Sequence, residues 1–432
     1  VVNGDNSSPR PFRSHLRALN DFGAGLIGRR KCMRQVSSSV SLLSRLERVR
    51  SLEGHRGCVN CCSFTQDGNT LITGSDDTSI KLWNWRSGVL DSTLPTLHSG
   101  NVFQARQLLH GMSDWIVSCA ADGQVQLHSM EGGGEASLVL GFHTGRAHKI
   151  SLNPVDANTF LSCGEDGLVL SYDTRSKSSR QVVAFFSERG RRVPLNSVVH
   201  NPLDPNKFAL AGGDNFVRIY DARMLPNPIE KLTPFTDETK RIGLHITCLE
   251  YSSVGELLAT YSEDFIYLWS NRHDQEVDRP KKFSGHLNCE TVKGVSFFGP
   301  NDDFVLSGSD DGHVFIWSKD TCKLLQLLKA DKDIVNCLTP HPDLTTLTLA
   351  TSGLEHNAKI WQPTANESTV PDESYTSDLI ELNKKSLSQT YVYNRELLEM
   401  VHVSFPSCSI TSSIITITIT SFCFSLLLTK NN

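Results

Sequence analysis

The segment GSDDTSIKLW, residues 74–83, decides how this chain folds. Its acid Asp77 lies six residues before the ring of Trp83, and a Gly-Ser-Asp run precedes that acid. Ile80 and Leu82 alternate with polar residues, which predicts a strand with one buried face. The acid and the small residues before it predict a tight turn leading into this strand. The segment is therefore expected to form one turn and one strand of an all-β protein.

The same turn-and-strand unit occurs seven times along the chain. Each copy places an acid six residues before an aromatic residue or a histidine, and successive acids are 44 to 49 residues apart. A period in this range is typical of a repeat architecture. The seven pairs are Asp77 with Trp83, Asp122 with His128, Asp166 with Tyr172, Asp214 with Tyr220, Glu263 with Trp269, Asp311 with Trp317 and Glu355 with Trp361.

A unit of about 40–45 residues with Gly-His near its start and Trp-Asp near its end is the signature of a WD-repeat propeller blade. Gly54-His55 and Gly285-His286 supply the Gly-His pairs. Each blade is a four-stranded sheet that cannot bury both faces alone, so we expect a seven-bladed WD-repeat β-propeller. Seven equivalent carboxylates cannot all form an active site, so these positions are interpreted as scaffold. The scaffold residues are His55, Asp77, Trp83, Asp122, Asp166, Asp214, Trp269, His286, Asp311, Trp317 and Trp361.

Closure of the ring requires a partner for its last sheet. We expect residues 46–52, which precede the first blade, to form the outer strand of blade seven and so to remove a sheet edge. The expected propeller spans residues 41–364. Its blades are expected at residues 52–94, 95–140, 141–188, 189–235, 236–283, 284–329 and 330–364.

The segments outside the ring differ from it in composition. Residues 1–40 are rich in Ser, Arg and Gly, so we expect them to be largely disordered. The basic run at residues 28–34 is either a nuclear-import or phosphate-contacting motif or a solvated basic stretch. Residues 365–400 are expected to be polar and partly helical. The first residue is Val1 rather than Met, which leaves the completeness of the N-terminus open.

Residues 401–432 form a tail in which Val403 to Thr429 carry no charge and Ile alternates with Thr. Three interpretations remain open for it. The tail is long enough for a membrane anchor, its β-propensity suits an aggregation-prone segment, and its composition also matches translation through a pyrimidine-rich intron. We favour the last, and a membrane partner is not expected.

The composition argues against several classes of chemistry. A net charge of -5 argues against binding nucleic acid with the whole protein, and no direct nucleic-acid partner is expected. The Cys58–Cys61 pair has metal-site spacing but lacks a second pair, so the scattered cysteines are interpreted as buried thiols in a reducing compartment. His98, His148, His286 and His341 fit blade starts, and no nucleophile–base–acid set stands out. We expect no metal, no cofactor and no enzymatic activity.

Two neighbouring repeats end in an aromatic-Asp-x-Arg unit. Asp173 and Arg175 follow Tyr172, whereas Asp221 and Arg223 follow Tyr220. Equivalent strands end on one face of the ring, so the two units are expected side by side, each acid holding its arginine ready for a partner. The alternative is that both units are ordinary features of WD repeats, since an Asp directly after the aromatic residue is common in such repeats.

Paired boxes of this kind resemble the docking signature of WD-repeat substrate receptors for cullin-4 ubiquitin ligases. The segments FLSCGEDGLVLSYDTR, GDNFVRIYDAR, NVFQA and VKGVSFFGP are more specifically similar to the cullin-4-associated factor eight subgroup (WD-repeat protein 42A). The likeness covers about residues 46–400, while the tail departs from it and the usual acidic N-terminal region is absent. The resemblance implies that Asp173, Arg175, Asp221 and Arg223 face the adaptor, damaged-DNA-binding protein one.

The leading hypothesis is thus a substrate-recognition subunit that holds unknown protein substrates near a ubiquitin-loading enzyme and acts by proximity. Substrates are expected on the opposite face and channel mouth, with residues 188–192 and other exposed loops as candidate contacts. The expected location is the nucleus and cytoplasm. The alternative is a WD-repeat scaffold outside any ligase, and an enzyme ranks third.

Overall fold

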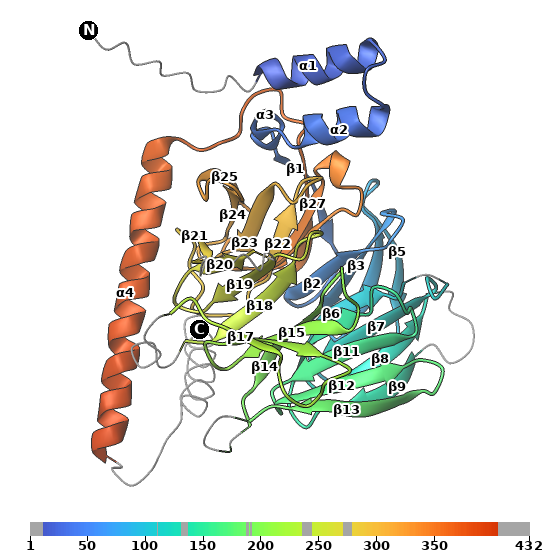
Figure 1. The fold of residues 1–432 in the computed structure, drawn as a ribbon, viewed down its shortest axis with the longest axis vertical. Coiled ribbons are helices and arrows are strands. Elements are labelled where there is room, and N and C mark those ends of the chain that lie inside the picture. Colours follow the sequence, from blue (N-terminus) through green and yellow to red (C-terminus); the bar gives the residue numbers. More distant parts are fainter. Residues whose placement is uncertain are drawn as a thin grey trace.

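Seven four-stranded antiparallel sheets are arranged as the blades of a ring in the computed structural model (Figure 1). The structure describes residues 12–109, 111–130, 137–186, 190, 192–235, 244–270 and 279–404. In six of the sheets the strands follow chain order, and the seventh takes its outer strand from the N-terminal side. The first strands of successive sheets contact one another around the ring axis. The predicted seven-bladed all-β propeller is therefore confirmed.

The first four blades use sixteen consecutive strands. They are β2 (Val59–Phe64), β3 (Thr70–Ser75), β4 (Ile80–Asn84) and β5 (Val89–Leu94) in blade 1; β6 (Val102–Gln107), β7 (Trp115–Ala120), β8 (Gln124–Ser129) and β9 (Ser137–Phe142) in blade 2; β10 (Ala147–Leu152), β11 (Thr159–Gly164), β12 (Leu168–Asp173) and β13 (Ser178–Ala184) in blade 3; and β14 (Leu195–His200), β15 (Lys207–Gly212), β16 (Val217–Asp221) and β17 (Glu230–Leu232) in blade 4.

The remaining three blades complete the ring, the last one with a strand from the N-terminal side. They are β18 (Ile246–Tyr251), β19 (Leu257–Tyr261), β20 (Ile266–Trp269) and β21 (Lys281–Phe283) in blade 5; β22 (Val295–Phe298), β23 (Phe304–Gly308), β24 (His313–Ser318) and β25 (Leu324–Lys329) in blade 6; and β26 (Val335–Pro340), β27 (Leu349–Gly353), β28 (Asn357–Gln362) and β1 (Glu47–Glu53) in blade 7.

Strand β1 closes the ring as expected, because it pairs with β28 in antiparallel register from Glu47 opposite Gln362 to Glu53 opposite Asn357. Leu46 and Leu52, at its two ends, are buried. The outer edge of β28 is thereby covered by the chain that leads into blade 1. Both ends of the ring are held in one sheet, which leaves β28 no open edge for another chain.

The expected disorder of residues 1–40 is wrong from residue 12 onward. Helices α1 (Phe12–Gly23), α2 (Arg29–Ser37) and α3 (Val40–Leu43) precede β1, and α1 and α2 form a hairpin at one end of the ring (Figure 1). The hairpin is ordered because it buries Ala18 and Cys32 and because α2 is tied to the ring. Arg34 Nη2 donates to the Pro300 carbonyl at 2.9 Å, and the Ser37 hydroxyl donates to the Thr345 carbonyl at 2.5 Å.

A long helix follows the ring. Helix α4 (Glu373–Ser404) runs along the outside of the sheets, beside blade 6, and Leu379 and Ile380 pack against the core that blades 5 and 6 share (Figure 1). A short 3-10 helix, Leu344–Thr346, lies in the β26–β27 loop. No helix in the described part of the chain is long and apolar enough to cross a membrane. Tail residues 405–432 lie outside the described residues, as do residues 1–11.

The alternation of strand direction gives the ring two distinct faces. Loops that follow the first and third strands of each blade lie on one face, called face A here, and the other loops lie on the opposite face. Asp173 and Asp221 are the last residues of the third strands β12 and β16. Both Asp-x-Arg units therefore reach face A from adjacent blades. Helix α3, which leads into the fourth strand of blade 7, lies on the same face.

Candidate functional site

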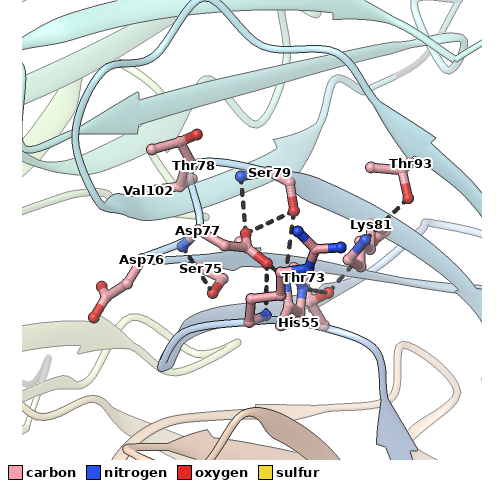
Figure 2. Close-up of polar contacts among 12 residues, drawn as sticks. His55, Thr73, Ser75, Asp76, Asp77, Thr78, Ser79, Lys81, Thr93 and Val102 are labelled. Carbon is pink, nitrogen blue, oxygen red and sulfur yellow. Dashed lines mark hydrogen bonds and ion pairs between the residues drawn. The ribbon is translucent and has the colours of Figure 1, made fainter.

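The repeated acids and aromatic residues form hydrogen-bond networks inside the blades. In blade 1, His55 Nδ1 lies 2.9 Å from Asp77 Oδ2 and His55 Nε2 lies 2.7 Å from Thr73 Oγ1 (Figure 2). Trp83 Nε1 donates to the same Thr73 hydroxyl at 2.9 Å. Asp77 also accepts from the backbone N–H groups of Arg56 and Ser79 at 2.9 and 3.0 Å. Asp77 thus fixes a turn and, through His55 and Thr73, links this turn to the buried Trp83 side chain.

Blades 2 and 3 repeat this network. In blade 2, His98 contacts Asp122 at 3.2 Å and Ser118 at 2.8 Å, and Ser118 contacts the His128 ring at 2.6 Å. In blade 3 the histidine is His143, which contacts Asp166 at 2.9 Å and Ser162 at 2.6 Å. These residues are linked to one another in the interior, so they act as scaffold.

His143 was missed by the sequence reasoning, which placed His148 at a blade start. His148 lies within β10, stacks on Phe103 and contacts Glu165 at 3.2 Å. His341 directly follows β26 and contacts the Gly68 carbonyl at 2.9 Å. The spacing could have identified His143, because it precedes its acid by 23 residues while His55 precedes Asp77 by 22.

The remaining four blades replace the network with other pairs. Asp214 binds the Arg218 guanidinium through both oxygens, at 2.9 and 2.6 Å. In blade 5 the fully buried acid is Asp264, which accepts from the Tyr267 hydroxyl at 3.1 Å, while Trp269 is only partly buried at the strand end.

In blade 7, Glu355 pairs with Lys359, and Trp361 donates to Thr351 at 2.9 Å. The sequence pattern thus places a turn and a strand correctly in each blade. It does not specify which groups meet inside.

The two Asp-x-Arg units have matching geometry on face A. Arg175 Nε and Nη2 donate to the two oxygens of Asp173 at 2.9 and 2.7 Å, and Arg223 Nε and Nη2 donate to those of Asp221 at 2.9 and 2.6 Å. In each unit the arginine backbone N–H also donates to the acid, at 3.0 and 2.9 Å. Each acid therefore fixes both the turn and the orientation of the guanidinium plane.

The arginines remain presented to solvent although their acids are held. The side chains of Arg175 and Arg223 are 63% and 62% exposed, whereas that of Asp221 is 6% exposed. Only the acid and, for Arg175, a more distant Asp156 at 3.7 Å contact these guanidinium groups within the described residues. The remaining N–H groups of each guanidinium are therefore available to a carboxylate or carbonyl of a partner.

The paired charges shift each other's ionisation. Hydrogen bonds from Arg223 lower the pKa of the Asp221 carboxyl to about 2, and those from Arg175 lower the pKa of Asp173. The same hydrogen bonds raise the pKa of both arginines. All four groups are consequently charged at neutral pH, and each unit is a pre-formed ion pair with one exposed cation.

Apolar side chains surround the two arginines on face A. Val155 in the β10–β11 loop is 71% exposed, Leu203 in the β14–β15 loop is 58% exposed, and Met224 beside Arg223 is 65% exposed. A cavity of about 150 Å³ between blades 3 and 4 is lined in part by the loops that carry these residues. We call Arg175, Arg223, Val155, Leu203 and Met224 the blade 3–4 surface. Exposed arginines among apolar side chains are a common composition of protein–protein contacts.

Blade 1 offers a useful contrast at the same position on face A. Arg86 follows Trp83 by three residues, but Asn84 replaces the acid. Arg86 instead donates to the Asn69 side chain at 2.9 Å and lies over the Trp85 ring at 4.5 Å. The bidentate pairing is thus a property of blades 3 and 4 rather than of every strand end.

The loop at residues 188–192 and the basic run at residues 28–34 were the other candidate contact segments. Within the loop at residues 188–192, only Gly190 and Arg192 are described, and Arg192 Nη1 donates to the Asp166 carbonyl at 3.3 Å. The basic run at residues 28–34 forms the start of α2, with Arg29, Arg30 and Lys31 exposed. Among the described residues, no group of three or more His, Cys, Asp and Glu side chains is arranged to hold a metal ion.

Comparison with known proteins identifies the repeats. Residues 46–84, 278–318 and 322–362 match the family model described as WD domain, G-beta repeat. These segments contain Trp83, Trp317 and Trp361. The chain therefore carries WD repeats in its first, sixth and seventh blades.

Curated relatives match shorter parts of the chain. Protein ALTERED SEED GERMINATION 2 of Arabidopsis thaliana is 34% identical over 148 residues, which is 32% of this chain and 20% of the relative. WD and tetratricopeptide repeats protein 1 of Homo sapiens is 42% identical over 103 residues, 24% of this chain and 14% of the relative. DDB1- and CUL4-associated factor 6 of Homo sapiens is 37% identical over 139 residues, 32% and 16% respectively. The matched segments span no more than a fifth of these relatives.

Proposed function

We propose that this protein is a substrate-recognition subunit of a CUL4 ubiquitin ligase and that the blade 3–4 surface binds the adaptor DDB1. The observation that carries the proposal is the pair of bidentate Asp–Arg units, adjacent on one face, each with an exposed guanidinium. The similarity to DDB1- and CUL4-associated factor 6 supports this class of partner. Membership of the factor eight subgroup and a location in the nucleus and cytoplasm are part of the same proposal.

The physical argument for docking is one of pre-organisation. An isolated surface arginine loses side-chain entropy when a partner immobilises it. Asp173 and Asp221 already hold the guanidinium groups of Arg175 and Arg223, so less entropy remains to be lost on binding. Val155, Leu203 and Met224 add apolar area that a partner could cover. The opposite face then remains open for a substrate, which the subunit brings to the ubiquitin-loading enzyme without chemistry of its own.

The test measures binding of purified DDB1 to the full chain and to an Arg175→Glu, Arg223→Glu double variant. Hot-spot arginines at interfaces are worth several kcal/mol, so we expect Kd to rise by about 100-fold or more. The matched control is Arg86→Glu, which changes an exposed strand-end arginine of blade 1 and should leave Kd within about twofold. Thermal melts of each variant establish that the ring is intact.

Each result decides between defined alternatives. Loss of binding in the folded double variant, with the Arg86 variant unaffected, supports the ligase-receptor function. Equal binding by all three proteins overturns the assignment of the blade 3–4 surface. No binding by the unaltered chain overturns the ligase proposal and favours a WD-repeat scaffold outside any ligase.

A further inference from the structure

The boundary between blades 7 and 1 brings two cysteines together from opposite ends of the ring. Cys62 on β2 and Cys337 on β26 are 275 residues apart in sequence, yet their Sγ atoms are 3.7 Å apart. The Cys62 backbone N–H also donates to Cys337 Sγ at 3.4 Å. Cys62 is buried and Cys337 is partly buried. Cys337 Sγ therefore lies against the thiol and the backbone N–H of one residue on the neighbouring blade, and it is also 3.7 Å from the Cys62 carbonyl, to which its own thiol can donate.

Equivalent positions elsewhere in the ring show what this contact replaces. Ser197, the third residue of β14, accepts from the backbone N–H of Leu249, the fourth residue of β18, at 3.0 Å. Gln104, the third residue of β6, likewise accepts from the N–H of Ile150 on β10 at 2.5 Å. Cys337 is the third residue of β26, and its donor Cys62 is the fourth of β2. A sulfur thus occupies an acceptor position that is filled by oxygen between other blades.

The surroundings favour the thiolate form of this sulfur. The hydrogen bond from the Cys62 thiol lowers the pKa of Cys337 against the opposing effect of burial, and the positive charges of Lys149 and Arg106 lower it further. The same hydrogen bond and burial raise the pKa of Cys62. Burial instead raises the pKa of Cys58 to about 11 and that of Cys289 to about 12, although both are also partly exposed. A partly accessible thiolate beside a second thiol is the arrangement found at redox-sensitive cysteine pairs.

We propose that Cys337 and Cys62 form a redox-active thiol pair that hydrogen peroxide converts into a disulfide across the seam of the ring. The Cys337 thiolate attacks one peroxide oxygen, the O–O bond breaks, and protonation of the leaving oxygen releases water, which leaves a sulfenic acid on Cys337. The Cys62 sulfur then attacks the Cys337 sulfur and expels the hydroxyl, which takes up the Cys62 proton and leaves as a second water. Two thiols are oxidised and one peroxide is reduced to two waters.

The product would be a covalent link between the first strands of blades 1 and 7. To form the bond, the two sulfur atoms must approach from 3.7 Å to about 2.05 Å. Ring closure otherwise depends on β1 and on non-covalent contacts between neighbouring blades. The disulfide would hold the two ends of the propeller together even if β1 were released. The proposal is independent of the ligase function, since it concerns the seam and not the blade 3–4 surface.

The test treats the full chain with hydrogen peroxide, blocks free thiols, digests without reduction and identifies linked peptides by mass spectrometry. The expected product joins the Cys62 and Cys337 peptides and is reversed by dithiothreitol. Oxidation should also raise the melting temperature by roughly 5 °C, because the closed loop is long. In Cys62→Ser, which lacks the second thiol, dimedone should trap the sulfenic acid on Cys337.

Two serine variants make the test specific. Cys337→Ser keeps a hydrogen-bond acceptor, as Ser197 does between blades 4 and 5, but should form no crosslink and show no oxidation-dependent shift in melting temperature. Cys61→Ser changes the neighbouring buried thiol and should leave the crosslink unchanged. A crosslink between Cys61 and Cys337, preferential oxidation of Cys58 or Cys289, or no modification of Cys337 while the protein remains folded would each overturn the proposal.

Discussion

Asn383 of helix α4 donates a hydrogen bond to the carboxylate of Asp311, with 2.5 Å between the two atoms, and so enters the turn of blade 6. Its amide also donates to the Gly285 carbonyl at 2.8 Å. His313 takes the other oxygen of Asp311 at 3.0 Å. His286, whose equivalents in blades 1 to 3 bind this acid, has no hydrogen-bond partner among the described residues. The C-terminal helix has therefore replaced the repeated network of one blade with its own contact.

Replacing Asn383 with alanine should weaken the attachment of α4. The change removes a charge-assisted hydrogen bond in a partly buried site, so we expect the free energy of unfolding to fall by about 2 kcal/mol. Denaturant unfolding measures the loss, and hydrogen exchange should show faster exchange in α4. Ser388→Ala is the control, because Ser388 is exposed and its hydroxyl, within the part of the chain that the structure describes, bonds to the Lys384 carbonyl of its own helix at 2.9 Å. A loss below about 0.5 kcal/mol would contradict the anchoring role.

The histidines of blades 1 and 6 should respond differently to the same substitution. His55→Leu removes two buried hydrogen bonds, one to Asp77 and one to Thr73, while their other partners remain, and we expect a cost of about 2–3 kcal/mol at pH 7.5. His286→Leu removes a buried ring that makes no hydrogen bond within the described residues, so we expect a cost below about 1 kcal/mol. Urea unfolding of both variants compares them directly. Equal costs would mean that His286 has a partner in solution.

Acid should destabilise the ring through its buried histidines. Burial lowers the pKa of His286 and of His200 to about 4, and that of His128 to about 3. The unfolded chain takes up protons at these sites below about pH 6.5, while the folded chain takes them up only near pH 4 or below. Stability contributed by these neutral rings is therefore complete above pH 6.5 and is lost as the pH falls toward 4.

His286→Leu isolates one part of this effect. The pKa difference of His286 corresponds to a loss of about 2 kcal/mol between pH 7.5 and pH 5. Unfolding free energies measured at both pH values should thus differ by about 2 kcal/mol less in the variant than in the unaltered protein. The same pH dependence in both proteins would show that His286 is protonated in the folded ring.

In the proposed contact with DDB1, Asp173 and Asp221 should adjust the affinity, whereas Arg175 and Arg223 should supply most of it. Asp173→Asn with Asp221→Asn keeps the side-chain shape but weakens the hold on Arg175 and Arg223, so we expect DDB1 binding to weaken by about 3- to 10-fold. This is less than the loss expected when the arginines are reversed in charge. Asn84→Ala in blade 1 is the control, and isothermal titration gives the affinities. Unchanged affinity in the acid variant would show that the arginines need no pre-orientation.

Much of the ring was predictable because its pattern is local. An acid and an aromatic residue six positions apart, with alternating apolar residues between them, define a turn and the strand after it. Asp77 and Trp83 are one such pair. The units ending in Arg175 and Arg223 were predictable for the same reason, since each acid binds an arginine only two residues away. The blade 3–4 surface was harder to foresee, because Val155 and Leu203 join it from other loops.

By itself, the sequence determined the number of blades, the turn and strand repeated in each of them and the presence of two Asp-x-Arg units, because each of these features is set by residues a few positions apart. Only the tertiary structure decided that Asp311 binds Asn383 of α4 instead of His286. It alone also decided that Cys62 contacts Cys337, which is 275 residues away in the sequence. It also decided that α1 and α2 are ordered against the ring. Each of these contacts joins two segments that are far apart in the sequence, and the local sequence pattern of one segment does not predict its contact with the other. Packing around the closed propeller brings the two segments within hydrogen-bonding distance.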